Sequence, residues 1–167
     1  KAMADAIDDD DAWAEVEGRD WYTTAQAMAD DEQFFHWELE YPEVFFSEDG
    51  ERGDDAGFDA VVGNPPYVKI QNLRKTNPKL AEYAVENYET STGRFDLYSL
   101  FVEAGAGIAR GHNLGYILPN KFFESQAGKG LRSFLGEEQM VRRIVDFGQQ
   151  QVFPTATTYT CLLFLGT

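Results

Sequence analysis

The sequence contains little cysteine, few basic residues and no long apolar run. Cys161 is the only cysteine among the 167 residues, which excludes an internal disulfide framework and suits a reducing cytoplasm. No apolar run approaches the roughly 18 residues that a membrane span needs, and the N-terminus lacks the apolar stretch of a signal peptide. We therefore expect a cytoplasmic protein with no membrane partner.

Lysine and arginine number 14 against 29 aspartates and glutamates, which gives a formal net charge of -15. This acidic balance argues against nucleic acid as a partner, because proteins that bind polyanions usually have a basic surface. The charge is uneven, however: residues 1–59 hold 20 acidic and 3 basic residues, whereas residues 60–167 hold 9 and 11. The net charge of the whole chain therefore describes its first third only.

The first third, residues 1–57, is expected to be an acidic helical or connector segment. Residues 1–35 have the composition of one or two acidic helices, and the aspartates at 8–11 are typical of a solvated helix face, with metal binding as a minor alternative. The aromatic stretch at 34–46 predicts extended structure or a packed loop. The polar, glycine-rich residues 47–57 predict a surface loop.

Residues 58–167 alternate between short apolar runs and amphipathic stretches, which predicts an α/β sheet covered on both faces. The first run ends at a glycine and is expected to be a buried parallel strand. The expected strands are 58–63, 114–118, 143–147 and 159–165, and the expected helices are 78–88, 95–109 and 125–135.

The sequence Asn64-Pro65-Pro66-Tyr67 follows the first expected strand directly, and ligands of such sheets bind beyond the carboxyl ends of the strands. Prolines donate no backbone hydrogen bond and have a fixed φ, so this loop is rigid and rich in acceptors. The Asn64 side-chain oxygen and the Pro65 carbonyl could both accept from one exocyclic amine, beside the flat face of Tyr67. Such acceptors would make the nitrogen nucleophilic without a strong base. An ordinary Asx-Pro turn is the alternative.

The longer stretch FDAVVGNPPY resembles the catalytic motif of amino-group methyltransferases that use S-adenosylmethionine. The blocks FFHWELEYPEVFF, GRFDLYSLFVEAG, GYILPNKFFES, GKGLRSFL and VFPTATTYTCLLF are similar, in the same order, to those of adenine-specific (N6) DNA methyltransferases of type II and IIG restriction-modification and phage-exclusion systems. The resemblance covers residues 33–167. It implies the C-terminal half of a Rossmann-like methyltransferase sheet, with a partial methyltransferase domain at 58–167.

This resemblance implies a role for each motif residue. Asn64, Pro65, Pro66 and Tyr67 would form the catalytic centre, in which Asn64 and Pro65 accept from the target amine and face the cofactor, S-adenosylmethionine. Tyr67 would stack on an adenine flipped out of double-stranded DNA. Phe153 would pack on the other face or edge of that adenine; an ordinary hydrophobic turn residue is the alternative.

Basic residues after the motif are candidates for contacts with phosphates beside the flipped nucleotide, and a plain solvated loop is an equal alternative. Lys121 matches a recurrent family position, but we assign it no chemistry. The candidates are Lys69, Arg74, Lys75 and Lys79.

Three other signals have structural explanations. Gly105 and Gly107 mimic a dinucleotide-binding glycine pattern, but they lie late in an expected helix, which favours helix packing. His36 and His112 have no partner at metal-ligand spacing, so we expect no metal. Cys161 lies in an apolar strand and is expected to be a core residue.

Two parts of the family pattern have no counterpart between Lys1 and Thr167: the glycine-rich loop that binds the cofactor, and the target-recognition domain after the last strand. We therefore expect an internal fragment that is inactive by itself. Its partners would be double-stranded DNA and the missing N-terminal half and target-recognition domain of the same polypeptide.

Two other functions stay open. Asn-Pro-Pro-Tyr also occurs in methylases of protein glutamine and of ribosomal RNA, although those lack the aromatic segment and the DLYSLF and PNKFF blocks. The third hypothesis is a non-catalytic DNA-binding or assembly module. The acidic first third is explained either by adaptation to high salt or by a connector that shields a DNA channel, and its confinement to one end favours the connector.

Overall fold

The computed structural model describes residues 9–32, 35–153 and 158–167. The chain forms two compact units, Lys1–Pro42 and Glu43–Thr167. The boundary falls before residues 43–57, which we expected to belong to the acidic segment. Within this segment the Gly57 amide donates to the Val44 carbonyl at 3.1 Å. The Phe45 ring also meets Phe58, just beyond the segment, edge-on with 5.5 Å between centroids.

The first unit contains helices α2 (Asp10–Glu17) and α3 (Asp20–Glu32), as the composition predicts. The Asp9 carboxylate caps α2 by accepting from the amides of Asp11 and Ala12, so the aspartate run starts this helix.

The expectation of extended structure or a packed loop at 34–46 is wrong for two short helices, α4 (Trp37–Glu40) and α5 (Pro42–Phe45). Proline at a first helical position needs no amide partner, so Pro42 can begin α5. Local helix geometry therefore overrides the strand preference of the aromatic side chains.

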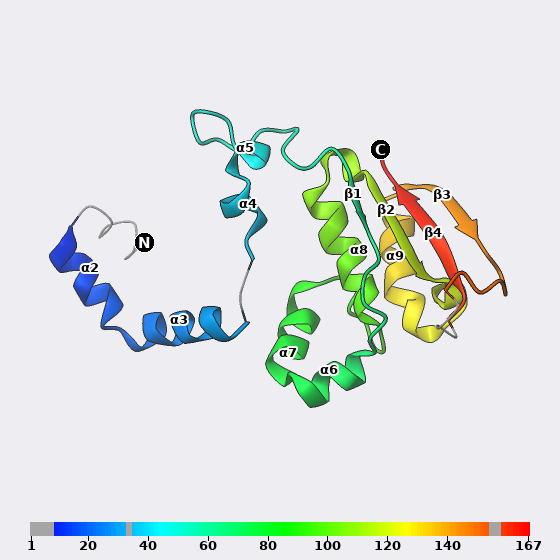
Figure 1. Ribbon diagram of the computed structural model, residues 1–167, viewed down its shortest axis with the longest axis horizontal. Helices are drawn as coiled ribbons and strands as arrows, with labels where there is room; N and C mark the ends of the chain where they lie inside the picture. The colour runs from blue at the N-terminus through cyan, green and yellow to red at the C-terminus, as the bar shows by residue number, and fades with distance from the viewer. Residues whose placement is uncertain (1–8, 33–34, 154–157) are drawn as a thin grey trace. The chain divides into compact units, whose positions relative to one another are not determined.

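The second unit contains a four-stranded sheet in the order β1-β2-β4-β3 (Figure 1). Its strands are β1 (Val61–Gly63), β2 (Leu114–Pro119), β3 (Val141–Asp146) and β4 (Thr160–Leu165). Strand β1 is parallel to β2, whereas β4 is antiparallel to both β2 and β3. This mixed sheet and its helices form an α/β structure that is consistent with a partial Rossmann-like methyltransferase fold, as expected.

Helices α8 (Leu97–Ile108) and α9 (Lys129–Glu137) pack on the same face of this sheet. Their side chains share one core with those of β2 and β4; Tyr98, Leu118, Leu131 and Leu163 are each 0% exposed there. Both connections, from β1 to β2 and from β2 to β3, advance across the sheet in the same direction. Right-handed crossovers of the same direction place their helices on one face.

The opposite face carries no helix of the second unit, so the expectation of a sheet covered on both faces is wrong for its described residues. A row across this face joins Val62, Gly115 and Phe164 in register. Val62 is 79% exposed. The expectation that the first strand is buried is therefore also wrong, although its parallel pairing is confirmed.

The expected role of the α8 glycines in helix packing is confirmed for Gly105 but not for Gly107, whose Cβ position is in open space. A Cβ atom at Gly105 would lie 2.6 Å from the Tyr116 hydroxyl oxygen, so this glycine lets the helix approach β2. His112 Nδ1 lies 3.0 Å from the Ala106 carbonyl at the same helix end. Cys161 is fully buried in the core, and burial raises the pKa of its thiol to about 12.

Between β1 and α8 lie helices α6 (Ile70–Thr76) and α7 (Pro78–Asn87), of which only α7 was expected. The Asn77 side chain caps α7 by accepting from the Leu80 amide at 3.0 Å. Short helical turns η1 (Arg110–His112), η2 (Asn120–Phe123) and η3 (Gln126–Gly128) complete the unit. Within the described parts of the chain, we find no helix with both the length and the apolar character that crossing a membrane requires.

Candidate functional site

Three loops meet at one edge of the sheet. Strands β1, β2 and β3 all run in the same direction, because β4 is antiparallel to both of its neighbours. Their carboxyl ends therefore lie at the same edge, where ligands of α/β sheets bind. The motif Asn64–Tyr67 follows β1, Asn120 and Lys121 follow β2, and the connection from β3 to β4 contains Phe153.

The motif loop is anchored at its second residue and open on both sides of it. Pro65 is buried, whereas Asn64 and Pro66 are exposed and Tyr67 is half-buried. Directly before the loop, a Cβ atom at Gly63 would lie 3.3 Å from the ring of Tyr116. The backbone thus passes close over β2 and leaves the Asn64 side chain accessible to a ligand.

The Tyr67 ring is held at two points. Its hydroxyl donates to the Ile117 carbonyl of β2 at 3.2 Å, and its ring meets Tyr98 edge-on, with 6.4 Å between centroids and 88° between planes. Burial, and next the nearby Cys161, raise the pKa of Tyr67. The phenol therefore stays neutral near pH 7 and serves as a fixed flat surface rather than as a base.

Beyond Tyr67 the chain pairs with the segment that leads into α8. The Leu97 amide donates to the Val68 carbonyl at 2.7 Å, and the Ile70 amide donates to the Phe95 carbonyl at 3.1 Å. Lys69 lies opposite Asp96 in this antiparallel bridge, and its side chain is exposed. The bridge therefore fixes the backbone of the loop and leaves the Lys69 ammonium in solvent.

An ion pair lies beside this bridge. Lys121 Nζ is 2.6 Å from Asp96 Oδ2, and the two side chains are 44% and 4% exposed. The Asp96 residue precedes α8 at its N-cap position, but its side chain makes no cap hydrogen bond. Its carboxylate faces the lysine that follows β2, so the pair joins the ends of two elements.

Asn120 connects the end of β2 to the third loop. Its Nδ2 donates to Asp146 Oδ1 at 2.9 Å and to the Gly148 carbonyl at 3.3 Å, and its backbone amide donates to the Tyr159 carbonyl at 3.0 Å. The hydrogen bond from the Asn120 side chain, with a second from the Gly148 amide, lowers the pKa of Asp146.

Phe153 lies in this third loop, directly before residues that fall outside the described ranges. Its side chain is half-buried. Topology brings it to the same edge as Tyr67, but the two rings are not in contact among the described ring pairs. A stack of Tyr67 and Phe153 on the two sides of one base stays a prediction.

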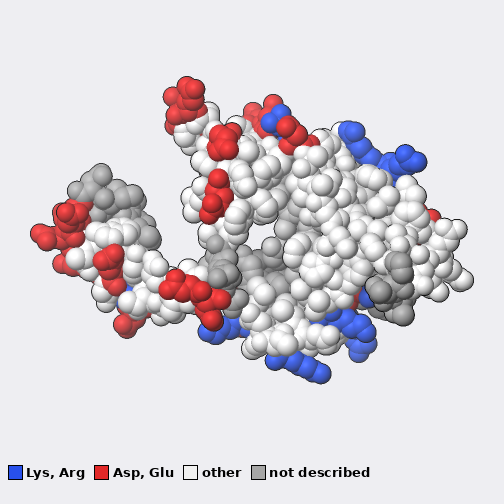
Figure 2. Space-filling model, viewed as in Figure 1, with Lys and Arg blue, Asp and Glu red and all other residues white. Residues whose placement is uncertain are grey.

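Basic residues extend from the motif along α6 and α7. Arg74 and Lys75 lie in the last turn of α6, Lys79 lies in the first turn of α7, and all three are exposed. Figure 2 shows basic side chains along the lower rim of the second unit, where Figure 1 places these helices. A polyanion near the motif would meet this rim.

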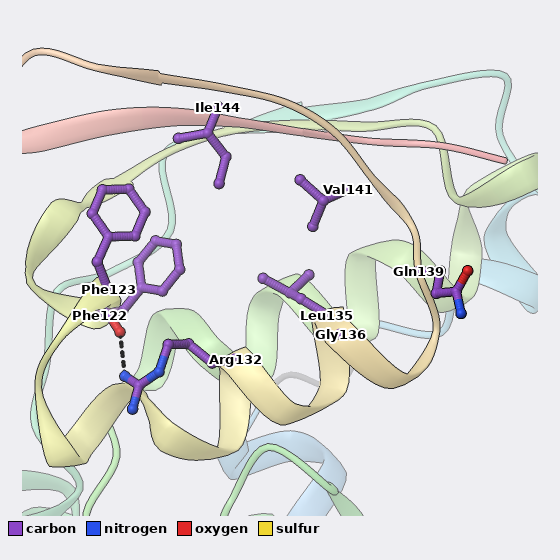
Figure 3. A pocket seen from close by; sticks show the side chains of 8 residues that line it. All are labelled: Phe122, Phe123, Arg132, Leu135, Gly136, Gln139, Val141 and Ile144. Atoms are coloured by element: carbon purple, nitrogen blue, oxygen red, sulfur yellow. Dashed lines mark hydrogen bonds between the residues drawn. The ribbon is translucent and has the colours of Figure 1, made fainter.

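Two hollows border the site elements. A cavity of about 300 Å³ adjoins Pro66 and is apolar; its other walls include Leu73, Leu97 and Phe101. A hollow of about 410 Å³ lies between α9 and β3, with Phe123, Leu135 and Ile144 around it (Figure 3). The Arg132 guanidinium beside it donates to the Phe122 and Ser125 carbonyls and so holds the η2–η3 turn.

Sequence reasoning assigned no chemistry to Lys121 and overlooked Asp96 and Asn120. The available signal was their placement: a carboxylate directly before an expected helix, and an amide and an ammonium directly after an expected strand. Among the described residues, no group of three or more His, Cys, Asp or Glu is placed to hold a metal ion.

The family model for the Eco57I restriction-modification methylases matches residues 5–153. The chain belongs to this family. The type II restriction enzyme and methyltransferase RM.Eco57I of Escherichia coli is 43% identical over 110 residues, which are 65% of this chain and 11% of that protein. The type II methyltransferase M.PaeR7I of Pseudomonas aeruginosa is 36% identical over 97 residues, which are 58% of this chain and 16% of that protein.

The chain thus spans between about a tenth and a sixth of the length of these two relatives. The match to the Eco57I family includes the motif loop, Asp96 and Lys121, and its last residue is Phe153. It begins at residue 5, whereas the resemblance visible in the sequence began at 33. The acidic first unit therefore lies almost wholly within the family match.

Proposed function

We propose that this chain is the target-amine part of a DNA adenine-N6 methyltransferase within a restriction-modification enzyme. The observation that carries the proposal is the motif loop at the carboxyl edge of β1: an exposed Asn64, a buried Pro65 and a Tyr67 ring held by β2 and Tyr98. Membership of the Eco57I family supports a methyl transfer. Double-stranded DNA is the proposed substrate.

In the proposed reaction, Asn64 and Pro65 accept hydrogen bonds from the two hydrogens of the adenine N6 amine. These bonds take the nitrogen lone pair out of conjugation with the ring, which makes the nitrogen nucleophilic. They also stabilise the positive charge that develops as the nitrogen is alkylated. The nitrogen forms a bond to the methyl carbon, the carbon–sulfur bond breaks with its electron pair going to sulfur, and one amine proton leaves to solvent. Tyr67 holds the flipped base by stacking.

S-adenosylmethionine supplies the electrophilic methyl group on a sulfonium sulfur. The residues present fit one flank of such a cofactor, because Asn64 is exposed and Pro66, two residues further along the chain, borders the apolar cavity of about 300 Å³. We assign Asn64 and Pro65 to the side that faces the methyl group, and Pro66 to the wall behind it.

The basic rim supports DNA as the substrate. The exposed Lys69 follows the motif, and the exposed Arg74, Lys75 and Lys79 continue along α6 and α7. Such side chains bind phosphates through charge and position the duplex rather than read its sequence. Phe153, at the same edge, is proposed to close the other side of the base.

The test is transfer of a tritiated methyl group from S-adenosylmethionine to duplex DNA by the full-length protein. We expect transfer by the wild-type protein and a loss of about 100-fold or more in Asn64→Ala, since removing one such acceptor or donor costs on that order. Tyr67→Ala should also lose transfer. Asn87→Ala is the matched control, because Asn87 is exposed on α7 and its described side-chain hydrogen bond stays within its own helix, at the Tyr83 carbonyl.

Digestion of the labelled DNA to nucleosides then identifies the modified base. Label in N6-methyladenine supports the proposal, and label in a cytosine derivative contradicts its adenine part. Unchanged transfer by Asn64→Ala would refute the assigned mechanism. Label found only in protein glutamine or in ribosomal RNA would favour the second hypothesis, and DNA binding without any transfer would favour the non-catalytic module.

A further inference from the structure

We propose that Asp96 and Lys121 form a positioning pair that holds the Asn64–Tyr67 loop in its working geometry, an inference that rests on the proposed function. Neither residue lies in the motif. Asp96 precedes α8 and Lys121 follows β2, so their 2.6 Å contact joins the two elements that Tyr67 of the loop contacts.

The first connection from the pair to the loop runs through the backbone. Asp96 lies between the two residues whose groups bond to the chain after the motif: the Phe95 carbonyl accepts from the Ile70 amide, and the Leu97 amide donates to the Val68 carbonyl. A shift of Asp96 therefore moves both hydrogen bonds. These bonds fix the backbone that begins directly after Tyr67.

The second connection runs through aromatic side chains. Tyr98 follows Asp96 by two residues and is 0% exposed, and its ring meets Tyr67 edge-on. Burial, and next the Asp96 carboxylate, raise the pKa of Tyr98. The Asp96 position thus sets both the backbone and the ring that support Tyr67.

The two members of the pair differ in exposure, and this difference predicts which of the two substitutions has the larger effect. The Asp96 side chain is 4% exposed, whereas that of Lys121 is 44% exposed. Removal of Lys121 leaves a buried carboxylate without its counter-ion, which is costly in a protein interior. Neutralisation of Asp96 leaves an ammonium that water can still reach, so its effect should be smaller.

The first experiment measures amide hydrogen exchange in the full-length protein. In Lys121→Met we expect amide exchange at Ile70 and Leu97 to accelerate at least about tenfold more than amide exchange in β4. The expected factor is smaller than for a fully buried pair, because Lys121 is partly exposed to water. Asp96→Asn should show a smaller acceleration. The double variant should lie closer to the wild-type protein than Lys121→Met does, because the unpaired buried charge is gone.

Arg110→Met is the matched control. It also removes a cation from an aspartate, but the Arg110–Asp59 pair spans 3.4 Å and its side chains are 51% and 90% exposed. Exchange at Ile70 and Leu97 should not change in this variant. If Lys121→Met does not fold, Asp96→Asn, which leaves no unpaired carboxylate, decides the question by the same two amides.

The second experiment measures methyl-transfer kinetics for the same variants. A positioning role predicts that kcat falls about tenfold or more while KM for DNA stays near its wild-type value, because geometry at the motif affects the chemical step. A purely structural role would instead accelerate exchange at β4 equally. Equal acceleration at β4, or a wild-type kcat in Lys121→Met, would overturn the proposal.

The two experiments separate this inference from the proposed function. If the wild-type protein transfers no methyl group to DNA, the proposed function fails, and exchange at Ile70 and Leu97 alone decides whether the pair holds the loop. If the wild-type protein is active and both amides exchange normally in Lys121→Met, the positioning pair is refuted and the proposed function stands.

Discussion

The two compact units are stabilised in different ways. In the first, Val16 is the one buried residue among the described side chains of α2 and α3, so these helices depend on local features such as the Asp9 cap. In the second, fully buried side chains such as Tyr98 and Leu163 join the helices to the sheet. Side chains held precisely enough for catalysis are therefore expected only in the second unit, where a shared core fixes the backbone.

The chain carries a separate probe for each unit. Trp13, Trp21 and Trp37 are the only tryptophans, and all belong to the first unit, so their fluorescence reports on that unit. Cys161 is the only cysteine and is buried in the second. Because burial raises the pKa of its thiol to about 12, it should react with a thiol reagent only when the second unit opens.

The largest effect is expected for Tyr98→Ala, which removes a fully buried ring from the core of the second unit. We expect the free energy of unfolding to fall by about 3–5 kcal/mol, measured by Cys161 labelling in increasing urea. Tyr98→Phe is the control and should cost little, because the Tyr98 hydroxyl has no hydrogen-bond partner among the described residues. A loss below about 1 kcal/mol in Tyr98→Ala would contradict a core-determined unit.

The next effect is expected for Gly105→Ala. The added Cβ atom would lie 2.6 Å from the Tyr116 hydroxyl oxygen, and such overpacking costs about 1–3 kcal/mol. Gly107→Ala places a Cβ atom in open space on the same helix and should instead stabilise the unit by about 0.4–1 kcal/mol. Equal signs for the two variants, measured by the same Cys161 labelling, would show that helix packing does not explain Gly105.

A smaller effect is expected for Tyr67→Phe. The change removes the hydroxyl that donates to the Ile117 carbonyl at 3.2 Å, and a hydrogen bond of this kind contributes about 0.5–1.5 kcal/mol. Urea denaturation followed at Cys161 measures the loss. Tyr83→Phe, at a side chain 56% exposed, should leave stability unchanged, and a similar loss in both variants would argue against the anchoring of Tyr67.

The smallest effect is expected for Asp9→Ala, which removes the cap of α2. An exposed cap of this kind contributes about 0.5 kcal/mol, the low end of the usual range. The loss should appear in the tryptophan fluorescence of the first unit at moderate urea concentrations. Labelling of Cys161 should not change, and a change there would break the contrast between the units.

Much of the second unit is predictable from sequence, because its core repeats with clear periods. The apolar runs at 114–118 and 159–165 correspond to β2 and β4, and the apolar spacing within 95–109 corresponds to α8. Periodicity does not reveal handedness, however. The common face of α8 and α9 follows from the order in which the strands join the sheet, and that order is a property of the folded chain.

The errors occur where few apolar residues decide the structure. Helix α6 has only Ile70 and Leu73 as buried residues, too short a pattern to read as helical. The aromatic residues at 35–46 favour strands by propensity, yet the only strand pairing described for them is the single bridge from Phe46 to Arg52, and residues 37–40 and 42–45 form α4 and α5. The candidate site has the same limit. The motif is contiguous and can be recognised in the sequence, whereas the Asp96–Lys121 ion pair joins residues far apart in sequence and cannot be predicted from it.

Strand β2 serves both walls of the candidate site. Its Ile117 carbonyl accepts from Tyr67, and directly after it Lys121 contacts Asp96 while Asn120 bonds to Asp146 and the Gly148 carbonyl. The motif loop and the loop that carries Phe153 are thus both referenced to one central strand. A substitution that displaces β2 is therefore expected to move both loops together, and with them Tyr67 and Phe153, the two side chains proposed to hold the base.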